Sequence, residues 1–98
     1  MSHTQKDQKK LLARVRRING QTASLEKALI DGEECLKVLQ QVAAVRGAIN
    51  GLMSELLEGH IREHLMNPLA SEQERNADME QIVAVVRSYR GRFRLRAK

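Results

Sequence analysis

A long proline-free stretch at residues 33–66 most restricts what this chain can fold into. Its apolar residues recur at helical spacing on two faces, which predicts one uninterrupted central helix from Glu33 to Met66, buried on two sides. Pro68 ends it, because Asn67, the residue before the proline, is disfavoured in the helical region. The two apolar stripes are Cys35, Val38, Val42, Val45, Ile49, Leu52 and Leu56, and Leu36, Leu39, Ala43, Met53, Leu57 and Ile61.

Shorter helical patterns flank this central stretch. Spacings of four and three predict a first amphipathic helix over residues 5–30, ended by Gly32. Ser71 and Glu74 have the spacing of a capping box, which predicts the start of a third helix. The expected buried residues are Leu11, Val15, Ile18, Thr22, Leu25 and Leu29 in the first helix, and Met79, Ile82, Val83, Val86 and Tyr89 in the third. The predicted fold class is all-α, with a three-helix protomer.

One cysteine and two histidines lie near opposite ends of the central helix. His60 and His64 are four residues apart and share a face, whereas Cys35 is ~37 Å away at a rise of ~1.5 Å per residue. A second copy in antiparallel orientation would bring Cys35 of one chain to the histidines of the other. Gly47 and Gly51 would then straddle the two-fold axis, where small residues let two helices approach closely. The spacing therefore predicts a dimer with two intersubunit Cys/His/His sites.

The composition favours a small intracellular protein of one domain. A chain of 98 residues buries only a modest core alone, for which oligomerisation is a common remedy. Its single cysteine excludes an intrachain disulfide framework and fits a reducing cytoplasm. No apolar run approaches the ~18 residues of a membrane span, and no signal peptide is apparent, so we expect a soluble cytoplasmic protein with no membrane partner.

Basic residues form two clusters at opposite ends of the chain, which carries a formal net charge of +5. Every charged residue between positions 6 and 17 is basic except Asp7, and residues 87–98 contain no acid. Such clustering predicts an anionic polymer or surface as partner. On the first helix, Lys10, Arg14 and Arg17 should form one stripe opposite the apolar seam; a merely solvated face is the alternative.

The sequence leaves the roles of two basic features open. After Gly91, basic and apolar residues alternate strictly, which predicts an extended or disordered tail that either contacts phosphates or only solubilises the chain. Arg46 stands beside the proposed glycine crossing and is either an ion-pair partner or a contact to that anionic partner.

Three motifs resemble the CsoR/RcnR family of small all-helical bacterial repressors. They are Arg14-Val15-Arg16-Arg17-Ile18-x-Gly20-Gln21, Cys35 with Leu39-Gln40-Gln41, and the run Ala43-Ala44-Val45-Arg46-Gly47-Ala48-Ile49-Asn50-Gly51-Leu52-Met53. The resemblance implies a metal-sensing, DNA-binding domain at residues 1–90, with 91–98 as a basic C-terminal tail outside the family pattern. It also implies a four-helix-bundle dimer, a disc-like homotetramer (a dimer of dimers), and double-stranded operator DNA as partner. The implied DNA contacts are Lys9, Lys10, Arg14, Arg16 and Arg17.

The inducer is indicated by a few positions. The ligand set His3, Cys35, His60 and His64 resembles that of the nickel- and cobalt-responsive branch, and the N-terminal amine of Ser2 could join it. Copper- and persulfide-responsive members need a second cysteine, which this chain lacks. Formaldehyde-responsive members typically show a proline in place of Ser2 and an acid in place of His64. A mixed sulfur and nitrogen set independently suits Ni(II), Co(II) or Zn(II). Glu34 and Glu63 flank these residues and could supply an oxygen ligand or a hydrogen bond to a ligand.

The predicted function is that of a nickel- or cobalt-responsive repressor that binds its operator without metal and releases it with metal. The alternative in the same class is a formaldehyde-responsive repressor in which Cys35 is the nucleophile. A metal buffer or structural bundle without DNA binding is a different class, which the charge stripe of the first helix disfavours. An enzyme is least favoured, because no oxyanion donors or pocket-forming aromatic residues accompany the Cys and His residues.

Overall fold

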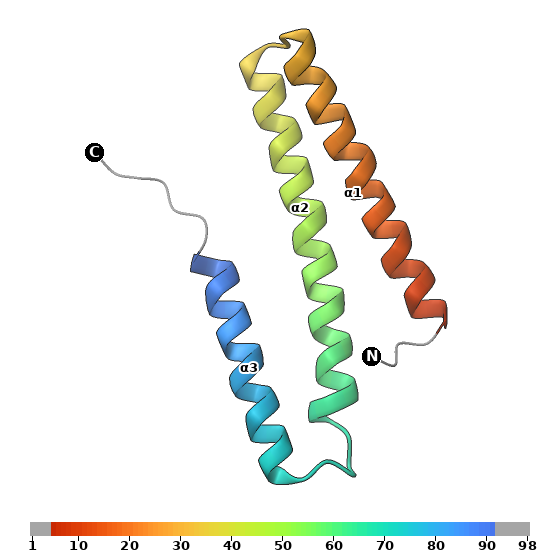
Figure 1. Cartoon of the computed structure of the whole chain (residues 1–98), viewed down its shortest axis with the longest axis vertical. Coiled ribbons are helices and arrows are strands. Elements are labelled where there is room, and N and C mark those ends of the chain that lie inside the picture. The colour runs from red at the N-terminus through yellow and green to blue at the C-terminus, as the bar shows by residue number, and fades with distance from the viewer. Residues whose placement is uncertain (1–4, 92–98) are drawn as a thin grey trace, which may run out of the picture. The chain divides into compact units, whose positions relative to one another are not determined.

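The computed structural model describes residues 5–91, which form three α-helices and one short π-helical segment. In chain order they are α1 (Gln5–Asp31), α2 (Cys35–His60), η1 (Ile61–Leu65) and α3 (Glu72–Gly91) (Figure 1). The predicted all-α fold with a long central helix is confirmed, and residues 5–91 contain no strand. None of the helices in this range is long and apolar enough to cross a membrane. The chain divides after Leu56 into two compact units.

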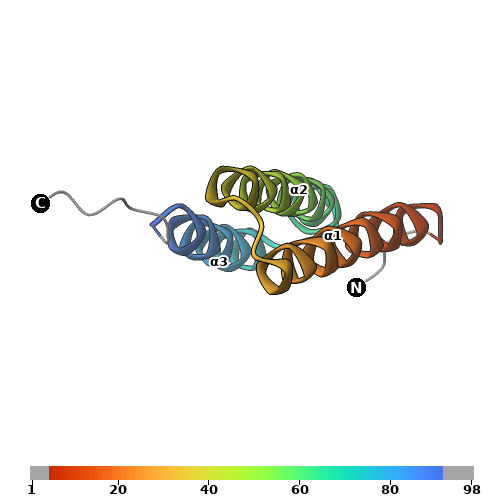
Figure 2. The ribbon, with the colours of Figure 1, turned by 90° about the horizontal axis from the view of Figure 1, so that it is seen from above.

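The first unit is built on a helical hairpin of α1 and α2, which a tight turn joins (Figures 1 and 2). Gly32 adopts a φ of 71°, the left-handed conformation that favours glycine. Its N–H donates to the carbonyl of Leu29 at 3.3 Å, and the N–H of Glu33 donates to that of Ala28 at 2.9 Å. These two bonds form a Schellman motif, which satisfies carbonyls at the end of α1. The predicted helix end at Gly32 is therefore confirmed.

The inner face of α1 is centred differently from the predicted seam. Leu11, Ile18 and Leu25 are half-buried as expected, but the residues that flank them inside are at positions 14, 21 and 28 rather than 15, 22 and 29. Ala28 is 5% exposed and is packed against the hairpin core, whereas Leu29 is 63% exposed. The other inner residues of α1 are Arg14 and Gln21, both half-buried. The seam thus carries polar side chains that a hydrophobic pattern could not select.

The central helix is covered on one face within the hairpin. Val45 is its buried residue, and Val38, Ala48 and Leu52 are half-buried on the same side. Several apolar residues of both predicted stripes face solvent in this protomer. These exposed residues are Leu36, Leu39, Val42 and Ile49. A large part of the apolar surface that the sequence assigns to a core is therefore available for another molecule.

In the second unit the helical pitch changes after the last residues of α2. Residues 61–65 form a π-helical turn, and the N–H of Met66 donates to the carbonyl of Ile61 at 3.0 Å, an i→i+5 bond. The prediction of one uninterrupted helix to Met66 is wrong in this respect, because the α-helix ends at His60 and a wider turn follows. Such turns are rare in proteins as a whole, and those that occur often lie at functional sites.

The start of α3 is stabilised by hydrogen bonds between residues that are close in the sequence. The N–H of Ser71 donates to Glu74 Oε1 at 2.8 Å, and the N–H of Glu74 donates to Ser71 Oγ at 3.1 Å, so the predicted capping box is confirmed. Before it, Asn67 Oδ1 accepts the N–H of Leu69 at 2.9 Å, and Arg75 Nη2 donates to the Asn67 carbonyl at 2.9 Å. These bonds fix the loop between η1 and α3.

The face of α3 that is turned inward differs in part from the prediction. Ile82, Val86 and Tyr89 are half-buried as expected, while Met79 and Val83 are exposed. The half-buried positions recur as 75, 78, 82, 86 and 89, so residues 79 and 83 lie one position round the helix from the packed face. Within this unit α3 contacts η1.

Candidate functional site

Two imidazoles lie together at the junction of α2 and η1. The ring centroids of His60 and His64 are 4.4 Å apart, with a tilt of 38° between the ring planes. His60 is half-buried, and the His64 side chain is 44% exposed. Glu63 Oε2 lies 3.8 Å from His64 Nε2. The two rings therefore share one accessible face, as their spacing predicted, with a carboxylate beside them.

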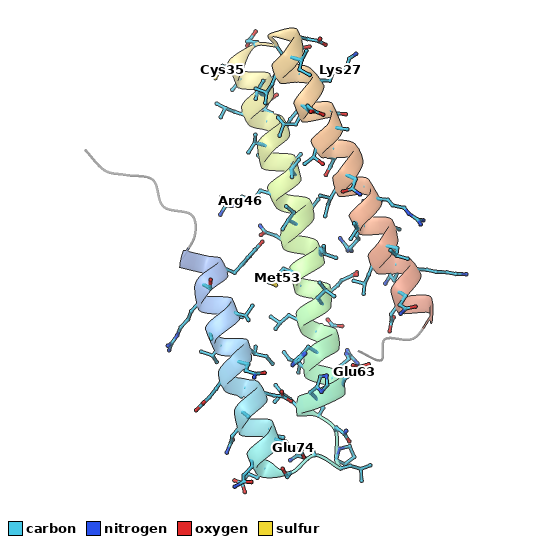
Figure 3. All side chains as sticks on the ribbon, viewed as in Figure 1. Lys27, Cys35, Arg46, Met53, Glu63 and Glu74 are labelled. Atoms are coloured by element: carbon cyan, nitrogen blue, oxygen red, sulfur yellow. The ribbon has the colours of Figure 1, made fainter. Side chains whose placement is uncertain are left out.

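The cysteine begins the same helix that His60 ends. Cys35 is the first residue of α2, its thiol is free, and its side chain is exposed beside the turn from α1 (Figure 3). Thiolates are both soft metal ligands and nucleophiles, and exposure makes this one accessible to either reaction. Cys35 and His60 occupy opposite ends of one continuous α-helix, as the sequence predicted.

The donor set fits a borderline divalent metal. Two imidazoles and one thiolate are ligand types that suit Ni(II), Co(II) and Zn(II). Within residues 5–91 no three His, Cys, Asp or Glu side chains of the protomer lie close enough to hold a metal ion. The predicted ligands Ser2 and His3 lie outside the described residues. The metal-ligating roles of Cys35, His60 and His64 stay predictions.

Most of the basic residues predicted to contact DNA project from α1 into solvent. Lys9, Lys10, Arg16 and Arg17 are exposed, and none of them forms an ion pair with another described residue. Their positive charges are therefore available to an anionic partner. Their role in DNA binding stays a prediction.

Arg14 differs from these residues, although the sequence grouped it with them. Its guanidinium Nη2 lies 3.1 Å from Glu55 Oε1 on α2, and its side chain is 39% exposed. The prediction that Arg14 faces away from the apolar seam is wrong, because residue 14 lies on the inner face of α1. Glu55 was not among the functional residues predicted from the sequence. A hairpin folded about residue 33 brings position 14 opposite about position 52, so the isolated acid nearby was the available signal.

The structure describes only some of the remaining basic residues. Arg46 is an exposed residue in the middle of α2 (Figure 3). Arg87 is exposed near the end of α3. The other basic residues of the C-terminal cluster, including the tail from residue 92, have no described side chains.

The sequence matches proteins of one family along nearly its whole length. A family profile described as metal-sensitive transcriptional repressor matches residues 7–88. A Serratia marcescens protein from the bioA 5′ region is 64% identical over 89 residues, which cover 91% of this chain and 98% of that protein. The transcriptional repressor RcnR of Citrobacter koseri is 48% identical with the same coverage.

A solved structure adds a match in three dimensions. It is a glutamate-to-histidine variant of the formaldehyde-responsive regulator FrmR from Salmonella enterica serovar Typhimurium, with a TM-score of 0.82 and 49% identity. The match covers 90% of this chain and 99% of that one. The matched family consists of transcriptional repressors rather than enzymes. The histidine pair, the free thiol and the basic α1 thus occur in a chain that belongs to the metal-sensitive transcriptional repressor (CsoR/RcnR) family.

Proposed function

We propose that this repressor responds to nickel or cobalt, binds operator DNA without metal and releases it when metal binds. The observation that carries the proposal is the pair of imidazoles on one accessible face, 4.4 Å apart between centroids. Together with the free thiol of Cys35 they supply the mixed nitrogen and sulfur donors that borderline metals prefer. The same set resembles the nickel- and cobalt-responsive branch of the family. Zn(II) shares these ligand preferences and is the competitor to test.

A complete site would draw on two copies of the chain. Exposed apolar residues of α2 leave a surface that a second α2 in antiparallel orientation would cover, and the thiol of one copy would then meet the histidines of the other. His3 and the Ser2 amine would complete the ligand set. The resulting dimer would pair into a homotetramer, as the family resemblance implies. Sedimentation that shows a stable metal-binding monomer would contradict this arrangement.

DNA binding would use the outer side of α1. Lys9, Lys10, Arg16 and Arg17 are exposed there and would neutralise phosphates, which favours shape and backbone readout over base reading. Residues 2 and 3 lead directly into this helix, so metal binding at His3 would reposition the basic surface. A coupling of roughly 1–3 kcal/mol per site is typical of allostery, and several sites together would empty the operator. A chain acting on operator DNA would work in the bacterial cytoplasm.

A formaldehyde response is the second candidate, favoured by the 49% identity with the FrmR variant and by the exposed thiol. In that mechanism the Cys35 thiolate would add to the aldehyde carbon, and the carbonyl oxygen would take up a proton. An imidazole at position 64 has no required part in this addition. His64 therefore separates the two candidates.

Operator release decides between them. Fluorescence anisotropy of labelled operator DNA would be followed while Ni(II), Co(II), Zn(II) and formaldehyde are titrated separately. We expect Ni(II) or Co(II) to release the DNA at buffered free-metal concentrations. Release by formaldehyde together with no response to any metal would replace the first proposal with the second.

A further inference from the structure

Arg14 is the one basic residue of α1 among positions 9–17 that the structure ties to another helix. Its Nη2 lies 3.1 Å from Glu55 Oε1, and the two side chains are 39% and 29% exposed. Leu11 and Ile18, one turn before and after it on the same face, are half-buried in the hairpin. The guanidinium thus belongs to the seam between α1 and α2 rather than to the outer surface.

Gly51 forms the seat on which this guanidinium lies. A Cβ at position 51 would stand 2.7 Å from Arg14 Nη1 and 3.7 Å from Cζ, closer than a real Cβ contact allows for the first atom. Gly51 and Glu55 are four residues apart and share a face of α2. One residue therefore leaves the space and the other supplies the carboxylate. Gly47, by contrast, has no such neighbour within 4 Å among the described residues.

We propose that Arg14 is a positioning residue for DNA binding, not a phosphate contact: through Glu55 and Gly51 it fixes α1 on α2. The inference rests on the proposed function of α1 as the DNA-binding helix. Lys10 and Arg17 lie four residues before and three after Arg14, so they are its neighbours on the helix surface. Fixing the rotation of α1 at Arg14 sets where these two exposed charges meet a phosphate backbone.

The charge balance at Arg14 supports positioning over direct contact. A guanidinium paired with a carboxylate presents little net positive charge to a third group. To reach a phosphate, Arg14 would leave Glu55 without its partner and bring a carboxylate near the DNA. A direct contact adds to the salt dependence of binding, about one unit of slope per phosphate. A positioning residue changes the affinity without that change in slope.

The first experiment measures operator affinity and its salt slope for four tetramer variants, with circular dichroism as the check on folding. Glu55→Gln should weaken binding about fivefold, the scale of a partly exposed ion pair. Glu55→Gln should weaken DNA binding even though the removal of a negative charge by itself would strengthen it. Arg14→Gln should weaken binding similarly with the slope unchanged. The charge swap of Arg14→Glu with Glu55→Arg keeps the net charge and should regain most of the lost affinity.

Arg17→Gln is the matched control on the same helix. It removes an exposed charge and should flatten the slope by about 0.9, the share of one phosphate. The inference is overturned if Arg14→Gln flattens the slope as Arg17→Gln does, or if Glu55→Gln binds as well as or better than wild type. Should the charge swap not fold, the direction of the Glu55→Gln effect alone decides.

A second pair of variants tests the seat without changing any charge. Gly51→Ala would displace the Arg14 guanidinium, whereas Gly47→Ala meets open space in the protomer. Both glycines flank the proposed dimer axis, so the second variant corrects for effects there. We expect a larger loss of DNA affinity in Gly51→Ala; equal losses would contradict the seat. If wild-type protein binds no operator DNA, the proposed function fails, whereas DNA binding that ignores Glu55 removes only this inference.

Discussion

The imidazole rings of His60 and His64 lie with their centroids 4.4 Å apart, tilted by 38°, where α2 ends and the π-helical turn begins. Residues four apart on a helix are neighbours in any case. Here the last α-helical residue is paired with a residue of the wider turn, and Glu63 Oε2 lies 3.8 Å from His64 Nε2. The pair offers two nitrogen donors on one accessible face.

Replacing His64 with glutamate should blunt the release of DNA by Ni(II) or Co(II). The substitution removes one of two adjacent imidazoles and leaves an oxygen donor, which suits these metals less well. Anisotropy of labelled operator during metal titration measures the effect, and a formaldehyde titration of the same variant is the control. Unchanged metal-induced release in His64→Glu would exclude His64 as a ligand.

Replacing Cys35 with alanine should abolish release by metal and by formaldehyde alike. The thiolate is the chain's strongest soft ligand and its one cysteine nucleophile. DNA binding without inducer should remain, because Cys35 begins α2 at the end of the hairpin and packs no core. Full metal-induced release by Cys35→Ala would place the site elsewhere.

Replacing Arg17 with alanine should weaken operator binding and reduce the slope of log affinity against log salt by about one. Its side chain is exposed and forms no ion pair with a described residue, so its charge is free for a phosphate. Metal affinity, measured by competition with a chelator, should stay nearly the same. An unchanged salt slope would argue that α1 is not the contact surface.

Glu74 should give α3 a pH-dependent part of its stability. The backbone N–H of Ser71, and then its side chain, lower the pKa of Glu74 below the ordinary value of 4.5. A carboxyl whose folded pKa is depressed stabilises the fold above the unfolded pKa, and this contribution disappears as the pH falls from 4.5 through the folded value. Glu74→Gln should therefore lack this component in urea unfolding at pH values on both sides of 4.5.

The same capping box offers a control at neutral pH. Ser71→Ala removes the oxygen that accepts the N–H of Glu74 at 3.1 Å. N-cap losses of this kind cost about 1 kcal/mol of unfolding free energy. A Glu74→Gln variant with the same pH dependence as wild type would show that the hydrogen bonds of Ser71 do not favour the charged carboxylate.

Removing residues 91–98 should weaken binding but keep the preference for the operator. The tail adds basic charge beyond residue 88, where the family match ends, and such charge acts on any DNA. Affinities for operator and unrelated duplex DNA should fall by a similar factor. A loss confined to the operator would assign the tail a part in recognition, and no loss at all would leave it a solubilising role.

Local signals in the sequence predicted the helix ends well. Gly32 and the Ser71–Glu74 pair behave as their residue types dictate, because each motif is closed by hydrogen bonds within a few residues. The positions of Leu11, Ile18 and Leu25 on the inner face of α1 were also predicted correctly, since these residues belong both to the predicted seam and to the observed inner face. The family resemblance and the matched proteins agree.

The flanks of that seam could not be predicted from hydrophobicity. The pattern favoured Val15 and Leu29 beside Leu11 and Ile18, yet the hairpin turns Arg14 inward, because Glu55 on α2 supplies a partner. That choice depends on a residue far away in the sequence. The π-helical turn was missed for a different reason: its i→i+5 bond is local, but no residue pattern predicts it. For His60 and His64 the sequence predicted that the two side chains share a face, but not that the helical pitch changes between them.

The π-helical pitch of residues 61–65 decides the direction in which the His64 ring points. Each residue is rotated about the helix axis relative to the one before it, by ~100° in an α-helix and by less in the wider π-helical turn. Deleting one residue between His60 and His64 would therefore turn His64 toward another side of the helix while both imidazoles remained. The kind of side chain at these positions and the direction in which it points are thus separate properties of this chain. The length of η1 sets the direction of the His64 ring relative to the His60 ring.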